Sequence, residues 1–89
     1  MSDLQAFHHR QKRALYRACH RGTKELDALL GGYVTQYVFD MGEDELCELE
    51  RFLALPDPVL DVWLMGREVP DEAPDKIMVD RVRTFHKLD

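Results

Sequence analysis

The sequence predicts an all-α protein, a compact five-helix bundle that forms a single domain over residues 1–89. Apolar residues recur at three- and four-residue steps in every segment, which is the spacing of one helix face. No stretch alternates as a half-buried strand does, and glycine and proline divide the chain into five helical segments. A chain of 89 residues fits one domain with one modest core.

The first two predicted helices are separated by a break at Arg21-Gly22. The first runs from about Asp3 to His20, and glycine favours its end because it is a poor helix-interior residue. Thr23 or Gly22 can cap the second helix. Gly31-Gly32 inside the second helix indicates either a kink or the close approach of another helix. The expected inner faces are Leu4, Phe7, Gln11, Ala14, Leu15 and Ala18, then Leu26, Leu29, Leu30, Tyr33, Val34 and Tyr37.

The third and fourth predicted helices follow breaks at residues 40–42 and 56–58. The third runs from about Glu43 to Ala54, and the acids in its first turn favour the positive end of the helix dipole. The fourth runs from about Pro58 to Met65, with Asp57 as its N-cap and Gly66 as its stop. The expected buried residues are Leu46, Leu49, Phe52 and Leu53, then Val59, Leu60, Trp63 and Leu64.

The fifth predicted helix runs from about Pro74 to His86, after an acidic turn at residues 70–74. Met78, Val82 and Phe85 share one face, with Ile77 and Val79 beside it. Links this short between amphipathic helices favour a bundle around one core.

The charge distribution is uneven. The net charge of −5 argues against a nucleic-acid binder, which needs a basic surface to neutralise phosphates. Residues 1–24 hold six Lys or Arg and one acid, whereas residues 40–75 hold twelve acids and two Arg. Such a dipolar surface suits oriented docking onto a partner, although two solvated faces would give the same composition.

The expected location is the cytoplasm of a bacterium. No apolar run approaches the roughly 20 residues of a membrane span, so no membrane insertion is expected. The N-terminus has no apolar signal-peptide region. Cys19 and Cys47 have no CxxC spacing, which argues against a disulfide framework and a zinc site.

Patterns of catalysis are missing from the sequence. It holds no GxSxG, P-loop or GxGxxG motif. His8-His9 and Cys19-His20 are adjacent pairs whose side chains would point about 100° apart on a helix, so neither pair forms a chelate by itself. We therefore expect neither an enzyme nor a metal protein.

The junction at residues 20–27 remains as the candidate site. Its structural interpretation is a helix end followed by a capped helix start, with Glu25 and Asp27 at the positive end of the second helix. Its functional interpretation is that Arg21 and Glu25 project from one corner, where an Arg fork beside a carboxylate can recognise another surface. The residues alone leave these two interpretations level.

The run Arg21-Gly22-Thr23-Lys24-Glu25 resembles the RGxxE motif of the SdhE-type (YgfY) flavinylation factors of succinate dehydrogenase. The preceding Tyr16-Arg17 stands where that family has an aromatic and a basic residue. The resemblance covers roughly residues 16–85, but His20 stands where many members have Arg, which weakens the permanent charge there. Further similar stretches are Asp57-Pro58, Trp63-Leu64-Met65 and Pro70, which resemble the family's DPxL, WLM and P positions, and Met78-Val79 with Arg81-Val82 in its last helix.

This resemblance implies an assembly factor and not an enzyme. Such factors bind the flavoprotein subunit of succinate dehydrogenase, and in some bacteria that of fumarate reductase, and promote covalent attachment of FAD to a histidine there without holding FAD tightly themselves. The implied partner-binding residues are Arg21, Gly22 and Glu25, with Arg17, His20 and Asp27 as further candidates. The alternative is a small acidic helical adaptor with an unrelated partner.

In the mechanism that the resemblance implies, the corner docks near the flavin site of the client. Arg21 would give charge-assisted hydrogen bonds to the client, Glu25 would orient them, and Gly22 would let the backbone approach closely.

Overall fold

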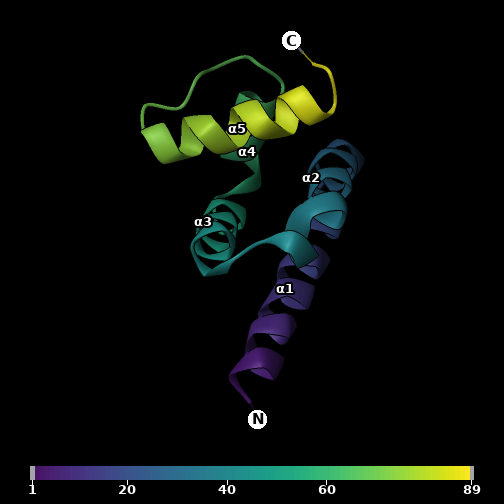
Figure 1. Cartoon of the computed structure of the whole chain (residues 1–89). Helices are drawn as coiled ribbons and strands as arrows, with labels where there is room; N and C mark the ends of the chain where they lie inside the picture. Colours follow the sequence, from purple (N-terminus) through teal and green to yellow (C-terminus); the bar gives the residue numbers. More distant parts are fainter. Residues whose placement is uncertain (1, 89) are drawn as a thin grey trace.

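The computed structural model describes residues 2–88, and within them it contains five α-helices and one short 3₁₀-helix (Figure 1). The all-α prediction is confirmed, and each helix end given above lies within one residue of its observed position. Met1 and Asp89 lie outside the described residues, so one domain over residues 1–89 stays a prediction. The helices are α1 (Asp3–Cys19), α2 (Lys24–Tyr37), α3 (Glu43–Leu53), α4 (Asp57–Leu64) and α5 (Ala73–Phe85), and the 3₁₀-helix η1 (Val38–Asp40) follows α2.

Helices α1 and α2 pack side by side and are joined by the short link at residues 20–23. The Thr23 hydroxyl caps α2 by accepting a hydrogen bond from the Leu26 N–H at 3.2 Å. Gly31 is buried against the end of α1, and a Cβ atom there would lie 3.0 Å from the Cys19 sulfur. Of the two explanations for Gly31-Gly32, the close approach of another helix therefore holds at Gly31.

The start of α4 differs from the prediction. Pro56 occupies the N-cap position of α4, and no side chain caps this helix, so the prediction that Asp57 is the N-cap was wrong. The Asp57 carboxylate instead accepts hydrogen bonds from Arg21 and Gly22, which are 36 and 35 residues earlier in the chain. The Asp57 side chain therefore bonds to residues that are distant in sequence, and not to the start of its own helix as local sequence rules predicted. Gly66 does end α4, with a φ angle of 76° that favours glycine.

The core lies where all five helices meet, and most of the predicted inner faces are buried. Leu4 is an exception at 82% exposed, because the start of α1 projects away from the other helices (Figure 1). Tyr37 and Phe85 are also exposed at their edge of the bundle, and Leu15, Leu29, Val59 and Trp63 are half-buried. The core comprises Ala14, Ala18, Leu26, Leu30, Val34, Val38, Leu46, Leu49, Phe52, Leu53, Leu60, Leu64, Met78, Val79 and Val82, with Tyr33 and Met41 at its margin.

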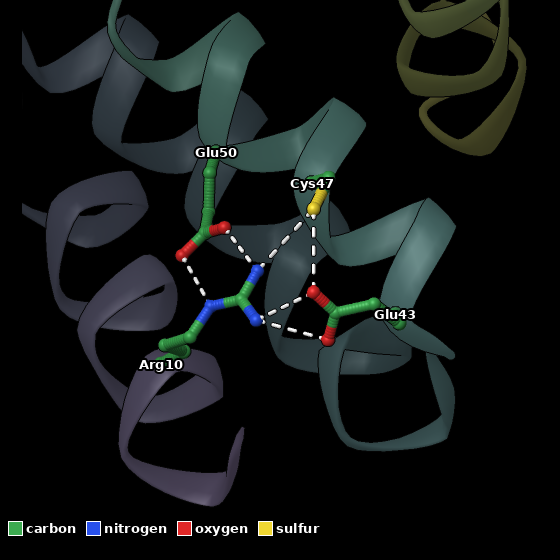
Figure 2. A network of polar contacts seen from close by, with 4 residues as sticks. All are labelled: Arg10, Glu43, Cys47 and Glu50. Atoms are coloured by element: carbon green, nitrogen blue, oxygen red, sulfur yellow. Dashed lines mark hydrogen bonds and ion pairs between the residues drawn. The ribbon is translucent and has the colours of Figure 1, made fainter. Parts of the chain in front are cut away.

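An ion network joins α1 to α3 near the N-terminal half of α1 (Figure 2). The Arg10 guanidinium lies between the carboxylates of Glu43 and Glu50, at 2.7 Å and 2.6 Å from their nearest oxygens. One Arg10 nitrogen also lies 3.4 Å from the Cys47 sulfur. The hydrogen bonds from Arg10 lower the pKa of Glu43. Because Arg10 binds both carboxylates, it fixes how α1 lies on α3.

Candidate partner-binding corner

The corner is formed by residues 20–27 together with Asp57 at the start of α4. The Arg21 side chain is only 11% exposed. Its guanidinium donates to Asp57 Oδ1 twice, from Nε at 2.9 Å and from Nη2 at 2.6 Å. Hydrogen bonds between a guanidinium and a carboxylate are stronger than those between neutral groups, and because both bonds end on one oxygen, Oδ2 stays open to another donor. Arg21 therefore points into the protein and not toward solvent.

The same guanidinium also closes the C-terminal end of α3. Arg21 Nη1 donates to the Leu53 carbonyl at 2.7 Å, and Nη2 donates to the Leu55 carbonyl at 3.1 Å. Carbonyls at a helix end lack partners within the helix and carry partial negative charge, so a cation is stabilising there. Four of the five N–H groups of this guanidinium thus have partners inside the chain.

Asp57 joins Arg21 to Gly22. Its Oδ1 accepts the two bonds from Arg21, and its Oδ2 accepts the backbone N–H of Gly22 at 2.8 Å. Partial burial favours the neutral acid, but the bonds from Arg21 and from the Gly22 N–H outweigh it, and the pKa of Asp57 lies below its ordinary value. We call this arrangement of Arg21, Gly22 and Asp57 the Arg21–Asp57 clamp.

Asp27 also acts inside the corner. Its Oδ1 accepts a hydrogen bond from the backbone N–H of Arg21, so it holds the link between α1 and α2 in place from the first turn of α2. Together with the Thr23 cap, this bond fixes the backbone on both sides of Gly22. This bond within the turn is a sufficient structural reason for an Asp at position 27.

The remaining candidates face outward. Glu25 and Arg17 are exposed, and among the residues that the structure describes the Glu25 carboxylate has no hydrogen-bond partner. His20 is exposed too and stacks on Tyr16, with ring centroids 4.0 Å apart. Its Nδ1 donates to the Tyr16 carbonyl at 2.8 Å, which leaves Nε2 as the outer nitrogen of the ring.

The structure thus divides the sequence-predicted site into two groups. Arg21, Gly22 and Asp27 hold the corner together, and Arg17, His20 and Glu25 lie on its outer side. Arg21 was expected to project from the corner beside Glu25, but its guanidinium is instead bonded to Asp57. Sequence reasoning missed this role of Asp57, although the motif and the DP stretch were both noted as similar to one family.

The second similar stretch lies further along α4. Pro58, Trp63 and Pro70 line a shallow hollow of about 630 Å³. Trp63 is half-buried and also packs on the core residue Phe52, with ring centroids 6.5 Å apart. The expectation of a core tryptophan is therefore only partly met, since one side of the indole lines the hollow.

None of the helices within residues 2–88 is long and apolar enough to cross a membrane. In the same part of the chain, His, Cys, Asp and Glu side chains form no group of three or more that could hold a metal ion.

The fold and the corner define a small all-helical protein with a rigid, charged junction between its first two helices. Residues 12–86 match the family described as "Flavinator of succinate dehydrogenase" (Sdh5). The chain belongs to this family, and the match includes the whole corner.

Individual relatives carry corresponding names. The chain is 45% identical over 64 residues to the "FAD assembly factor SdhE" of Acetobacter pasteurianus, a match that covers 71% of this chain and 59% of that relative. It is 36% identical over 63 residues to the protein of the same name from Legionella pneumophila (strain Paris), covering 71% of this chain and 80% of the relative. It is 43% identical over 61 residues to the "Succinate dehydrogenase assembly factor 2, mitochondrial" of Arabidopsis thaliana, covering 68% of this chain and 32% of that relative.

Proposed function

We propose that this protein binds the flavoprotein subunit of succinate dehydrogenase in the cytoplasm and promotes the covalent attachment of FAD to it. The family match over residues 12–86 supports the client and the cofactor. We extend the proposal to the related fumarate reductase subunit in bacteria that have one. FAD is the substrate of the client's reaction in this account and not a resident cofactor of this chain.

The observation that carries the proposal is the outward-facing half of the RGxxE motif. Glu25 is an exposed carboxylate on a backbone that the Arg21–Asp57 clamp, the Thr23 cap and Asp27 hold in one conformation. A fixed carboxylate loses little conformational entropy when it accepts hydrogen bonds from a partner. Arg17 and His20 lie exposed at the end of α1 and widen this polar surface.

The mechanism is catalysis by positioning. The bond-forming chemistry belongs to the flavin and to the client, which attaches FAD to itself. This chain contributes a rigid surface that holds parts of the client in the geometry that the attachment needs, and holding reacting groups in place lowers the entropic cost of the reaction. The chain is a helper of the reaction and not its enzyme.

Replacing Glu25 with Ala tests this proposal. We expect covalent flavin on the client to fall about tenfold or more, the effect of losing one charge-assisted hydrogen bond. The measurement is in-gel flavin fluorescence of the client subunit from cells whose only copy of this protein is the variant. Circular dichroism of the purified variant checks that the helices remain.

Asp44→Ala is the matched control. Asp44 is also an exposed acid in the first turn of a helix, but it lies on α3, away from the corner. It should leave covalent flavin unchanged. Wild-type flavin in the Glu25→Ala strain would refute the proposed site, and an equal loss from Asp44→Ala would show that only net charge matters.

A further inference from the structure

The surroundings of Gly22 give a specific reason for the glycine in the motif. Its φ angle lies outside the left-handed region, so its backbone conformation does not require glycine. A Cβ atom at this position would lie 2.6 Å from Asp57 Oδ2, a separation that nonbonded atoms do not tolerate. The next nearest atom, Asp57 Cγ, would be at 3.7 Å, which is ordinary contact. The steric demand on Gly22 within this chain therefore comes from one carboxylate.

That carboxylate cannot easily move away. Its other oxygen is held by two bonds from Arg21, whose guanidinium is itself bound to the carbonyls of Leu53 and Leu55. Asp57 is also fixed at its backbone as the first residue of α4, followed directly by Pro58. A side chain at position 22 would therefore break the bond from its own N–H to Asp57 or push Arg21 off the end of α3.

We infer that Asp57 is a positioning residue of the RGxxE corner, and that Gly22 is a glycine because of Asp57 and not because of the partner. In this arrangement Arg21 acts through the clamp, and Glu25 is the motif residue that faces the client. The stability part of this inference concerns this chain alone, whereas its effect on the client rests on the function proposed above.

A double-mutant cycle on the purified protein tests the inference without any client. Gly22→Ala should raise the unfolding equilibrium constant about tenfold in the wild-type background. In the Asp57→Ala background the same change should alter it by less than about twofold, because alanine is compatible with the backbone there. Equal effects in the two backgrounds would overturn the inference. If Asp57→Ala does not fold, Asp57→Ser shortens the side chain while keeping a residue suited to a helix start.

Binding to the client gives the second arm of the test. We expect Asp57→Asn, which keeps the side chain's shape, to weaken the affinity for the flavoprotein subunit about tenfold, since a carboxamide cannot accept the bonds of both Arg21 and Gly22. Arg10→Ala is the control, because it also breaks an ion network between helices but lies away from the corner. It should lower stability and leave that affinity unchanged. Equal losses of affinity from the two variants would reduce Asp57 to a general stabilising role and overturn its assignment.

The two arms separate failure of this inference from failure of the proposed function. If Glu25→Ala left flavin attachment intact while the unfolding cycle showed coupling, the proposed function would fall and the clamp would stand. If Glu25→Ala abolished attachment while Gly22→Ala weakened client binding equally with and without Asp57, Gly22 would be a contact residue and the inference would be wrong.

Discussion

The side chain of Arg21 shows how one residue can fit two descriptions. Its sequence context suggests an exposed guanidinium ready for a partner, yet it is 11% exposed and bonded to Asp57 and to two carbonyls at the end of α3. The motif is therefore built with an inner half and an outer half. Arg21 and Gly22 are turned toward Asp57, and Glu25 is exposed.

Acid should weaken the clamp in a defined direction. The pKa of Asp57 in the folded protein lies below its ordinary value, so the stability that its charge contributes is present above pH 4 and is lost as the pH falls through the folded-state pKa. We expect Asp57→Asn to cost about 1–2 kcal/mol at neutral pH, and this difference from wild type should shrink as the pH falls below about 4.

Urea unfolding of the wild type and of Asp57→Asn between pH 7 and pH 3 measures this difference in the free energy of unfolding. Taking the difference between the two proteins removes the shared contribution of Glu43, whose pKa is also lowered. A difference that stayed constant over the whole pH range would show that the charge of Asp57 plays no part in the stability of the fold.

At the scale of helices, the sequence predicts the elements better than their contacts. Periodicity and Gly or Pro breaks locate all five helices, because both are local properties of the chain. The role of Asp57 was predicted wrongly because its hydrogen-bond partners are distant in sequence, whereas propensity rules consider only neighbouring residues. The Arg10 network was missed likewise, because its members are 33 and 40 residues apart.

The packing of α1 on α2 is tested at Gly31. Alanine inside a helix is more favourable than glycine by about 1 kcal/mol, but a Cβ at position 31 would lie 3.0 Å from the Cys19 sulfur. We therefore expect Gly31→Ala to give no gain in the free energy of unfolding. In a Cys19→Ala background, where the sulfur is gone, the same change should stabilise by up to about 1 kcal/mol.

Chemical denaturation of the four proteins measures this coupling. A full gain from Gly31→Ala in the wild-type background would contradict the close contact between α1 and α2. It would also reopen the kink as the explanation for the glycine pair.

At the scale of the whole molecule, the two charge blocks of the sequence bind each other. Arg10 and Arg21 come from the basic first part, and their partners Glu43, Glu50 and Asp57 come from the acidic middle. Part of the dipolar surface expected from composition is thus used to fasten α1 and the corner to α3 and α4. The basic residues that remain exposed, such as Arg17, are the ones available to a partner.

This fastening predicts a dependence on salt. Arg10→Ala should lower the thermal midpoint at low ionic strength, and the gap from wild type should narrow in high salt, because the network is partly exposed and ions screen it. Melting curves followed by circular dichroism at low and high salt measure this gap. A gap that did not change with salt would mean that Arg10 stabilises mainly by packing.

We propose that a rigid corner ending in Glu25 promotes flavin attachment to the client. The most direct test mixes purified flavoprotein subunit, made without this protein, with FAD and then with wild-type chain or Glu25→Ala. We predict that covalent flavin on the subunit rises with the wild-type chain and stays near the level without it for Glu25→Ala. Equal covalent flavin with and without the wild-type chain would contradict the account.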